Sequence, residues 1–110
     1  MIELTDASAD LISDRFRALA EPMRLRLLHN LRKGELSVGE LAERVGAGQA
    51  NVSKHLQVLF QQGFVERRKA GTTTWYRVAD PAVFELCSLV CGGIEDELDR
   101  RRQLLRPRRG

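Results

Sequence analysis

The sequence has few cysteines, no long apolar run and little room for a second domain, and each scarcity excludes a class of protein. Two cysteines, Cys87 and Cys91, are too few for the disulfide framework of a small secreted domain, and in a reducing cytoplasm we expect thiols. Apolar stretches of only a few residues fall far short of the roughly 20 that span a bilayer. Residues 1–10 carry three acidic residues and no apolar core, so we expect no signal peptide, no membrane partner and a cytoplasmic location.

The short chain also leaves no space for a separate catalytic domain. Its 110 residues correspond to about one domain with a single modest core. The cysteine pair is not a Cys-x-x-Cys motif and has no candidate catalytic base beside it, which argues against a small redox enzyme. We therefore expect a protein that binds a partner and is not an enzyme.

The charge is distributed unevenly, although the net charge is only +3. Residues 44–77 contain six basic residues and one acidic residue. The last eleven residues add six arginines, and all the acidic residues lie at or before Asp99. A basic stripe inside an otherwise acidic domain is typical of polyanion binding, although the same pattern also fits a solvated surface.

Hydrophobic spacing predicts four helices in the first part of the chain. The first covers 9–19, capped by Ser8 or Asp6, and the second runs from Pro22 to about Lys33, with Arg24 on its wet side and Gly34 as a left-handed cap. Ser37 and Glu40 form a capping box at the start of the third. The fourth covers 49–62, with Val52, Leu56, Leu59 and Phe60 facing inward, and the tight glycine turn at 46–48 that precedes it is typical of a helix-turn-helix.

Two strands and a last helix are predicted to follow. Segment 64–68 is expected to form a strand, and segment 73–78, which is rich in β-branched and aromatic residues, is expected to pair with it around a turn at 70–72. Asp80 and Pro81 are expected to open the last helix, which reaches Leu98 or Leu105. This order predicts a mainly α fold with a small β-hairpin wing, a winged helix-turn-helix over 1–106, and a basic, disordered tail at 107–110.

Polar side chains at the start of the 49–62 helix are suited to reading the major groove. Gln and Asn can bond adenine with two hydrogen bonds, Ser bonds either base type, and Lys meets phosphate or guanine. The hairpin supplies cationic and hydroxyl side chains for phosphates. The predicted contacts with double-stranded DNA are Gln49, Asn51, Ser53, Lys54, His55, Arg68, Lys69 and Thr72. The alternative is an ordinary solvent face.

Several segments resemble the ArsR/SmtB-type repressors. Residues 21–28 (EPMRLRLL) are similar to the opening signature of that family. The segment 49–59, with its Ser-Lys-His-Leu run, and the segment 63–71 are similar to its recognition helix and the start of its wing. The resemblance covers about 10–98. It implies a homodimer joined through the first and last helices, which represses an operon by binding an inverted repeat and is released by an inducer. Ala50 stands where many relatives have serine, which implies one missing contact.

The two best-known metal sites of that family are not matched here. Segment 35–39 has no cysteine, and the last helix has no histidine. What remains is Cys87 and Cys91, whose i, i+4 spacing places both sulfurs on one helix face. They could bind a thiophilic metal or metalloid, or react with an oxidant or a reactive sulfur species, as the inducer site of a thiol sensor. They could equally be packing residues of a strongly apolar helix.

Two further readings stay open. One is a DNA-binding regulator with structural cysteines and no metal inducer. The other is a winged-helix module that binds proteins, against which the basic wing and the polar helix face argue. His29 on the second helix is expected to lie at the surface.

Overall fold

The computed structural model describes residues 3–106, which divide into two compact units. The first unit ends at Asp80 and the second begins at Pro81. The prediction of one domain over 1–106 stays a prediction, and the predicted tail at 107–110 lies outside the described residues.

Helices form most of the first unit, and their apolar faces enclose its core. They are α1 (Asp6–Leu19), α2 (Pro22–Asn30), a 3₁₀ turn (Leu31–Lys33), α3 (Val38–Val45) and α4 (Gln49–Gln61). The largest fully buried side chains are Leu27, Leu28, Leu41, Val52, Leu56, Leu59 and Val65. Each such side chain stabilises the fold by about 1.5–3 kcal/mol relative to exposure. The predicted inner face of α4 is confirmed for Val52, Leu56 and Leu59, whereas Phe60 is only half-buried.

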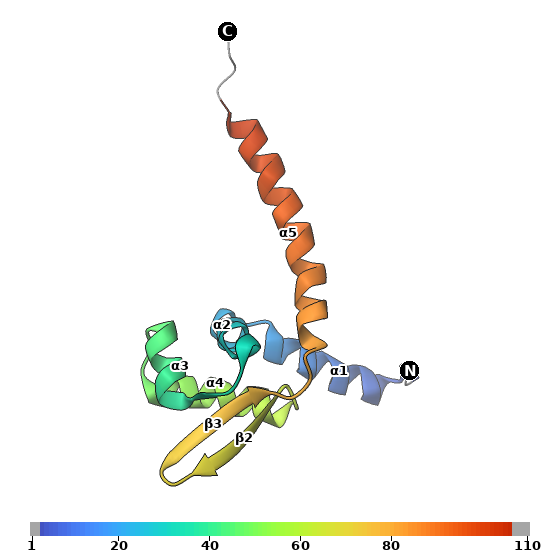
Figure 1. Cartoon of the computed structure of the whole chain (residues 1–110). Coiled ribbons are helices and arrows are strands. Elements are labelled where there is room, and N and C mark those ends of the chain that lie inside the picture. Colours follow the sequence, from blue (N-terminus) through green and yellow to red (C-terminus); the bar gives the residue numbers. More distant parts are fainter. Residues whose placement is uncertain (1–2, 107–110) are drawn as a thin grey trace. The chain divides into compact units, whose positions relative to one another are not determined.

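A three-stranded antiparallel sheet completes this unit. β2 (Val65–Ala70) and β3 (Thr73–Val78) form the predicted hairpin, with Arg67 opposite Tyr76 and Lys69 opposite Thr74. Gly71 occupies the turn with φ +63°, a conformation that favours glycine. The hairpin extends beyond the helices of its unit (Figure 1). The order β1-β3-β2 includes a strand that we did not predict, β1 (Leu36–Ser37), which pairs with β3.

Three details near α1 and α2 differ from the predictions. Thr5 is the N-cap of α1, and Ser8 lies at the third helical position, where its Oγ accepts from the Thr5 amide at 2.8 Å. Gly34 ends the 3₁₀ turn with φ +146° and ψ −176°, a conformation that favours glycine but differs from the predicted left-handed helical cap. Arg24 is half-buried instead of solvated, because backbone and side-chain acceptors surround its guanidinium.

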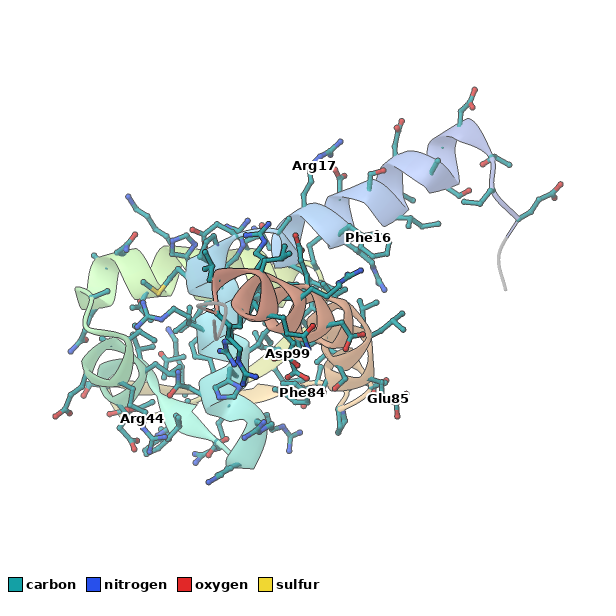
Figure 2. The ribbon with its side chains drawn as sticks, turned by 90° about the horizontal axis from the view of Figure 1, so that it is seen from above. Phe16, Arg17, Arg44, Phe84, Glu85 and Asp99 are labelled. Atoms are coloured by element: carbon teal, nitrogen blue, oxygen red, sulfur yellow. The ribbon has the colours of Figure 1, made fainter. Side chains whose placement is uncertain are left out.

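The first turns of α1 extend away from the rest of its unit (Figure 2). Leu11 is 68% exposed and Phe16 is 56% exposed, although both belong to the apolar face of this helix. Phe16 and Arg17 lie on opposite sides of the α1 ribbon in the same view (Figure 2). The apolar face of α1 is therefore only partly covered within one chain.

The second unit is a single long helix, α5 (Val83–Leu105). The predicted start at Pro81 is wrong. The Phe84 amide donates to Pro81 O at 3.0 Å and the Glu85 amide to Ala82 O at 3.1 Å, so a tighter turn precedes the helix proper. The residue at the N-cap is Ala82, not Asp80. Among the residues described, no helix combines the length and the apolar character that a membrane crossing needs.

Candidate nucleic-acid interface

The turn before α4 sets the direction of the recognition helix. Gly46 ends α3 in the left-handed conformation, with φ +67°, and Gly48 is the extended N-cap residue of α4. Val52, Leu56 and Leu59 are buried on one side of α4. At about 100° per residue, the opposite side carries Ala50, Asn51 and Lys54.

This outward side of α4 is open to solvent. Ala50, Asn51 and Lys54 are all exposed. Within the described part of the chain, no protein group bonds the Asn51 amide or the Lys54 ammonium. Their donors and acceptors are therefore available to an external ligand. The residues on the two flanks of α4 determine the shape of the surface that this ligand would meet.

The flank of α4 that faces the wing contains a polar groove of about 360 Å³. The groove is lined by residues of β1, α3, α4, the hairpin turn and β3: Ser37, Val38, Gly39, Gln49, Ser53, Thr72, Thr73 and Thr74. A Cβ atom added to Gly39 would lie 3.6 Å from Gln49 Nε2, so the Gln49 amide lies close to the first turn of α3. Hydroxyl and amide donors dominate this lining, which suits an anionic group.

The opposite flank of α4 holds His55. Its side chain is only 20% exposed. The Nδ1 atom lies 3.3 Å from Arg24 Nη1 and 3.7 Å from a carboxylate oxygen of Glu21. The sequence predicted that His55 contacts DNA together with the other polar residues at the start of α4. The structure places His55 on the side of α4 that packs towards α2.

The arginines of the wing are held by acceptors of the protein. Arg68 forms a bidentate pair with Glu35, with N–O distances of 2.6–3.0 Å, and its guanidinium lies 5.4 Å from the centre of the Trp75 ring. The hydrogen bond from Arg68 lowers the pKa of Glu35 and raises that of Arg68. Arg67 donates to Gln57 at 2.8 Å and Arg77 to Glu66 at 2.7 Å.

Lys69 and Thr72 stand apart from these pairs. Both are exposed, and Lys69 lies opposite Thr74 on the hairpin. In the described chain, no acidic side chain pairs with Lys69. Among the described cations of α4 and the wing, Lys54, Arg67 and Lys69 have no acidic partner. Arg67 still donates to the neutral Gln57, whereas Lys54 and Lys69 bond no acceptor of the protein.

Two residues that sequence reasoning missed shape this surface. Arg24 was predicted to be solvated, and Glu35 was considered only as part of the segment 35–39 that has no cysteine. Arg24 contacts His55, 31 residues later, and Glu35 contacts Arg68, 33 residues later. No local pattern indicates pairs so distant in sequence.

The two cysteines lie on α5 as predicted, on one side of the helix and one turn apart. Cys87 is half-buried and Cys91 is exposed, and both are free thiols. Burial raises the pKa of the Cys87 thiol, and the neighbouring Cys91 adds to this effect. Among the described residues, no cluster of three or more His, Cys, Asp or Glu side chains could hold a metal ion. One copy of the chain thus offers two thiols and no third ligand beside them.

Comparison with known proteins identifies a helix-turn-helix family and a repressor as similar to this chain. A family described as "Helix-turn-helix domain" matches residues 19–68. A probable mercury resistance operon repressor of Streptomyces lividans is 43% identical over 74 residues, which are 67% of this chain and 59% of that protein. The chain thus spans less than two thirds of the length of that relative.

Two solved structures are similar to this chain over a larger share of their own length. The homodimeric winged helix-turn-helix domain of Mb0332 from Mycobacterium bovis, a possible ArsR-family regulator, is 33% identical, with a TM-score of 0.75 over 91% of this chain and 95% of that one. The antimony-specific transcriptional repressor AntR is 35% identical, with a TM-score of 0.75 over 90% of each chain. The predicted winged helix-turn-helix fold is confirmed.

Proposed function

Given that this chain belongs to the ArsR/SmtB-type family of winged helix-turn-helix regulators, we propose that it is a homodimeric repressor that binds an inverted-repeat operator through α4 and the wing. Members of this family bind DNA and are not enzymes, in agreement with the prediction from chain length. The observation that carries the proposal is the outward face of α4, polar and unpaired beside a donor-lined groove.

The positions of the side chains favour different DNA contacts for different residues. Asn51 and Lys54 both point away from the core. Asn51 reaches base edges, where Asn can bond adenine with two hydrogen bonds, and Lys54 meets a backbone phosphate. Gln49, Ser53 and Thr72 line the wing-side groove and bind a phosphate of the backbone. Lys69 supplies charge at the wing. Arg68 reaches phosphate only when it leaves Glu35, so its contribution is smaller than sequence alone suggests.

An inverted repeat requires two copies of the reading surface related by a two-fold axis. The exposed apolar faces of α1 and α5 are suited to pairing with a second copy of the chain. The similar Mb0332 domain is described as homodimeric, which supports the same assembly here. Half-sites would then lie about 34–36 Å apart, or a multiple of one helical turn.

We further propose that Cys87 and Cys91 receive the inducer. Two relatives are named for mercury and antimony, both thiophilic elements. The i, i+4 spacing places two sulfurs together on α5, and a second copy of the chain could add two more. Binding of a thiophilic ion displaces thiol protons, so the raised pKa of Cys87 makes the response stronger as pH increases.

Selection from random-sequence DNA tests the repressor proposal. The wild-type protein should enrich an inverted repeat, and its affinity for that repeat should fall steeply with salt, because bound phosphates release counterions. A variant with Asn51→Ala and Lys54→Ala should lose the enrichment while its unfolding temperature stays unchanged. Failure of the wild-type protein to enrich any sequence, together with salt-independent binding, would instead support a protein-interaction module.

A further inference from the structure

Arg24 joins three elements of the first unit. Its Nε donates to Ala18 O at 2.6 Å and its Nη2 to Arg17 O at 3.1 Å, both near the end of α1. Its Nη1 lies 3.3 Å from Nδ1 of His55 on α4. One guanidinium on α2 thus connects the C-terminal end of α1 to one flank of the recognition helix.

The contact with Arg24 fixes the position of the proton on His55. A guanidinium has five donors and no acceptor, so Nδ1 must accept. A neutral imidazole that accepts at Nδ1 carries its proton on Nε2. The alternative, an Nδ1–H that donates to Glu21, is weaker on geometry, because that distance is 3.7 Å and the carboxylate already accepts from the Arg24 amide at 3.0 Å.

Nε2 is the atom of His55 that remains available. Among the residues that the structure describes, none bonds to it, and the side chain keeps 20% of its surface exposed. A helix in the major groove has a phosphate backbone along each flank. The wing-side groove meets one of these backbones, and His55 lies on the other flank of α4.

We propose that Arg24 is a positioning residue for DNA binding, which holds the His55 ring so that its Nε2–H donates to a backbone phosphate on the side of α4 away from the wing. This inference rests on the proposed DNA binding. Two α1 carbonyls hold the guanidinium in place, so it does not depend on His55 for its own orientation. The negative end of the α1 dipole adds to that hold.

A ring-nitrogen NMR experiment tests the tautomer directly. The sequence has only one other histidine, the exposed His29, which serves as an internal reference. Wild-type His55 should show the Nε2–H tautomer, and Arg24→Met should give a mixture of tautomers. Arg26→Met is the matched control, since Arg26 lies on the same helix but donates to Val45 O at 3.0 Å and not to α4. An Nδ1–H tautomer in the wild-type protein, or no change in Arg24→Met, would overturn the proposal.

Two substitutions of His55 separate the roles of its nitrogens. Glutamine keeps a donor near the Nε2 position, and asparagine keeps an acceptor near the Nδ1 position. Affinity for the selected operator and for unrelated DNA of equal length should fall about tenfold in His55→Asn and stay within about threefold of wild type in His55→Gln.

The pattern of losses decides between the possible outcomes. Equal losses in both variants, or no loss in either, would contradict the phosphate contact even if Arg24→Met fails to fold. A loss in His55→Asn on the operator alone would mean a base contact and would also contradict it. Absence of DNA binding by the wild-type protein would refute the proposed function and not merely this inference.

Discussion

The helices α4 and α5 each leave one side open to solvent, but the two sides differ in chemistry. On α4 the exposed residues are polar or small, with Asn51 and Lys54 at the centre. On α5 they include large apolar residues, with Leu89 77% exposed and Ile94 50% exposed. An open polar face is stable in water and complements a polyanion, whereas an open apolar face loses about 25 cal/mol for each Å² left exposed. In the proposed repressor this difference corresponds to two kinds of partner, DNA for α4 and a second copy of the chain for α5.

The largest effect should come from making the open face of α5 polar. Val90→Glu combined with Ile94→Glu places charges in its apolar face, so the protein should sediment as a monomer. Affinity for the inverted repeat should fall by about 100-fold or more, because each half-site is then bound alone. Ser88→Glu, which lies on the other side of α5, is the control and should leave both properties unchanged. A protein that remains a dimer with both substitutions would contradict the assignment of the apolar face of α5 to the dimer interface.

The next effect concerns the response to an inducer. Cys87→Ser with Cys91→Ser should keep operator affinity but require at least about ten times more mercuric or antimonite ion for DNA release, if it releases at all. For the wild-type protein, the ion concentration needed for release should fall between pH 7 and pH 9, because the pKa of Cys87 lies above its ordinary value. A double variant that still responds like wild type would show that the thiols only pack.

On α4, single substitutions should separate base reading from charge. Asn51→Ala should weaken operator binding about tenfold and relax sequence preference at one base pair of each half-site. Lys54→Ala should weaken all DNA sequences alike and reduce the salt slope by about 0.9 for each phosphate that the protein no longer neutralises. Competition titrations against a set of singly altered operators distinguish these outcomes. Uniform weakening by Asn51→Ala would mean that this amide contacts the backbone.

The smallest effect should come from the ion pairs of the wing. Glu35→Gln releases Arg68, so DNA binding should tighten about threefold and its salt dependence should steepen. Glu66→Gln, which releases Arg77 in the same way, is the matched control and should change binding less, because Arg77 is not among the predicted DNA contacts. Anisotropy titrations at several salt concentrations measure both. No difference between the two variants would mean that Arg68 does not reach DNA.

Local patterns in the sequence were sufficient for most of the fold. The capping box of Ser37 and Glu40, the buried face of α4 and the hairpin pairing all depend on residues close in sequence, and the structure agrees with each. The strand β1 was missed because it has two residues and exists only by pairing with β3. The start of α5 was misplaced because Asp80 and Pro81 resemble a helix start, whereas a tighter turn comes first.

The candidate site was only partly predictable for the same reason. The exposed positions of Asn51 and Lys54 follow from helical periodicity. The Arg24–His55 and Glu35–Arg68 contacts join residues more than 30 positions apart, so spacing carries no information about them. Those two contacts change the expected roles of His55 and Arg68 more than any other feature of the structure.

DNA reading by α4 is tested most directly by amide NMR mapping of the protein titrated with its selected operator. We expect the largest shift changes in residues 49–55 of α4 and residues 69–74 of the wing, while amides on the exposed polar side of α5 change little. Shift changes concentrated on α5, with α4 unaffected, would contradict the claim that the outward face of α4 reads DNA.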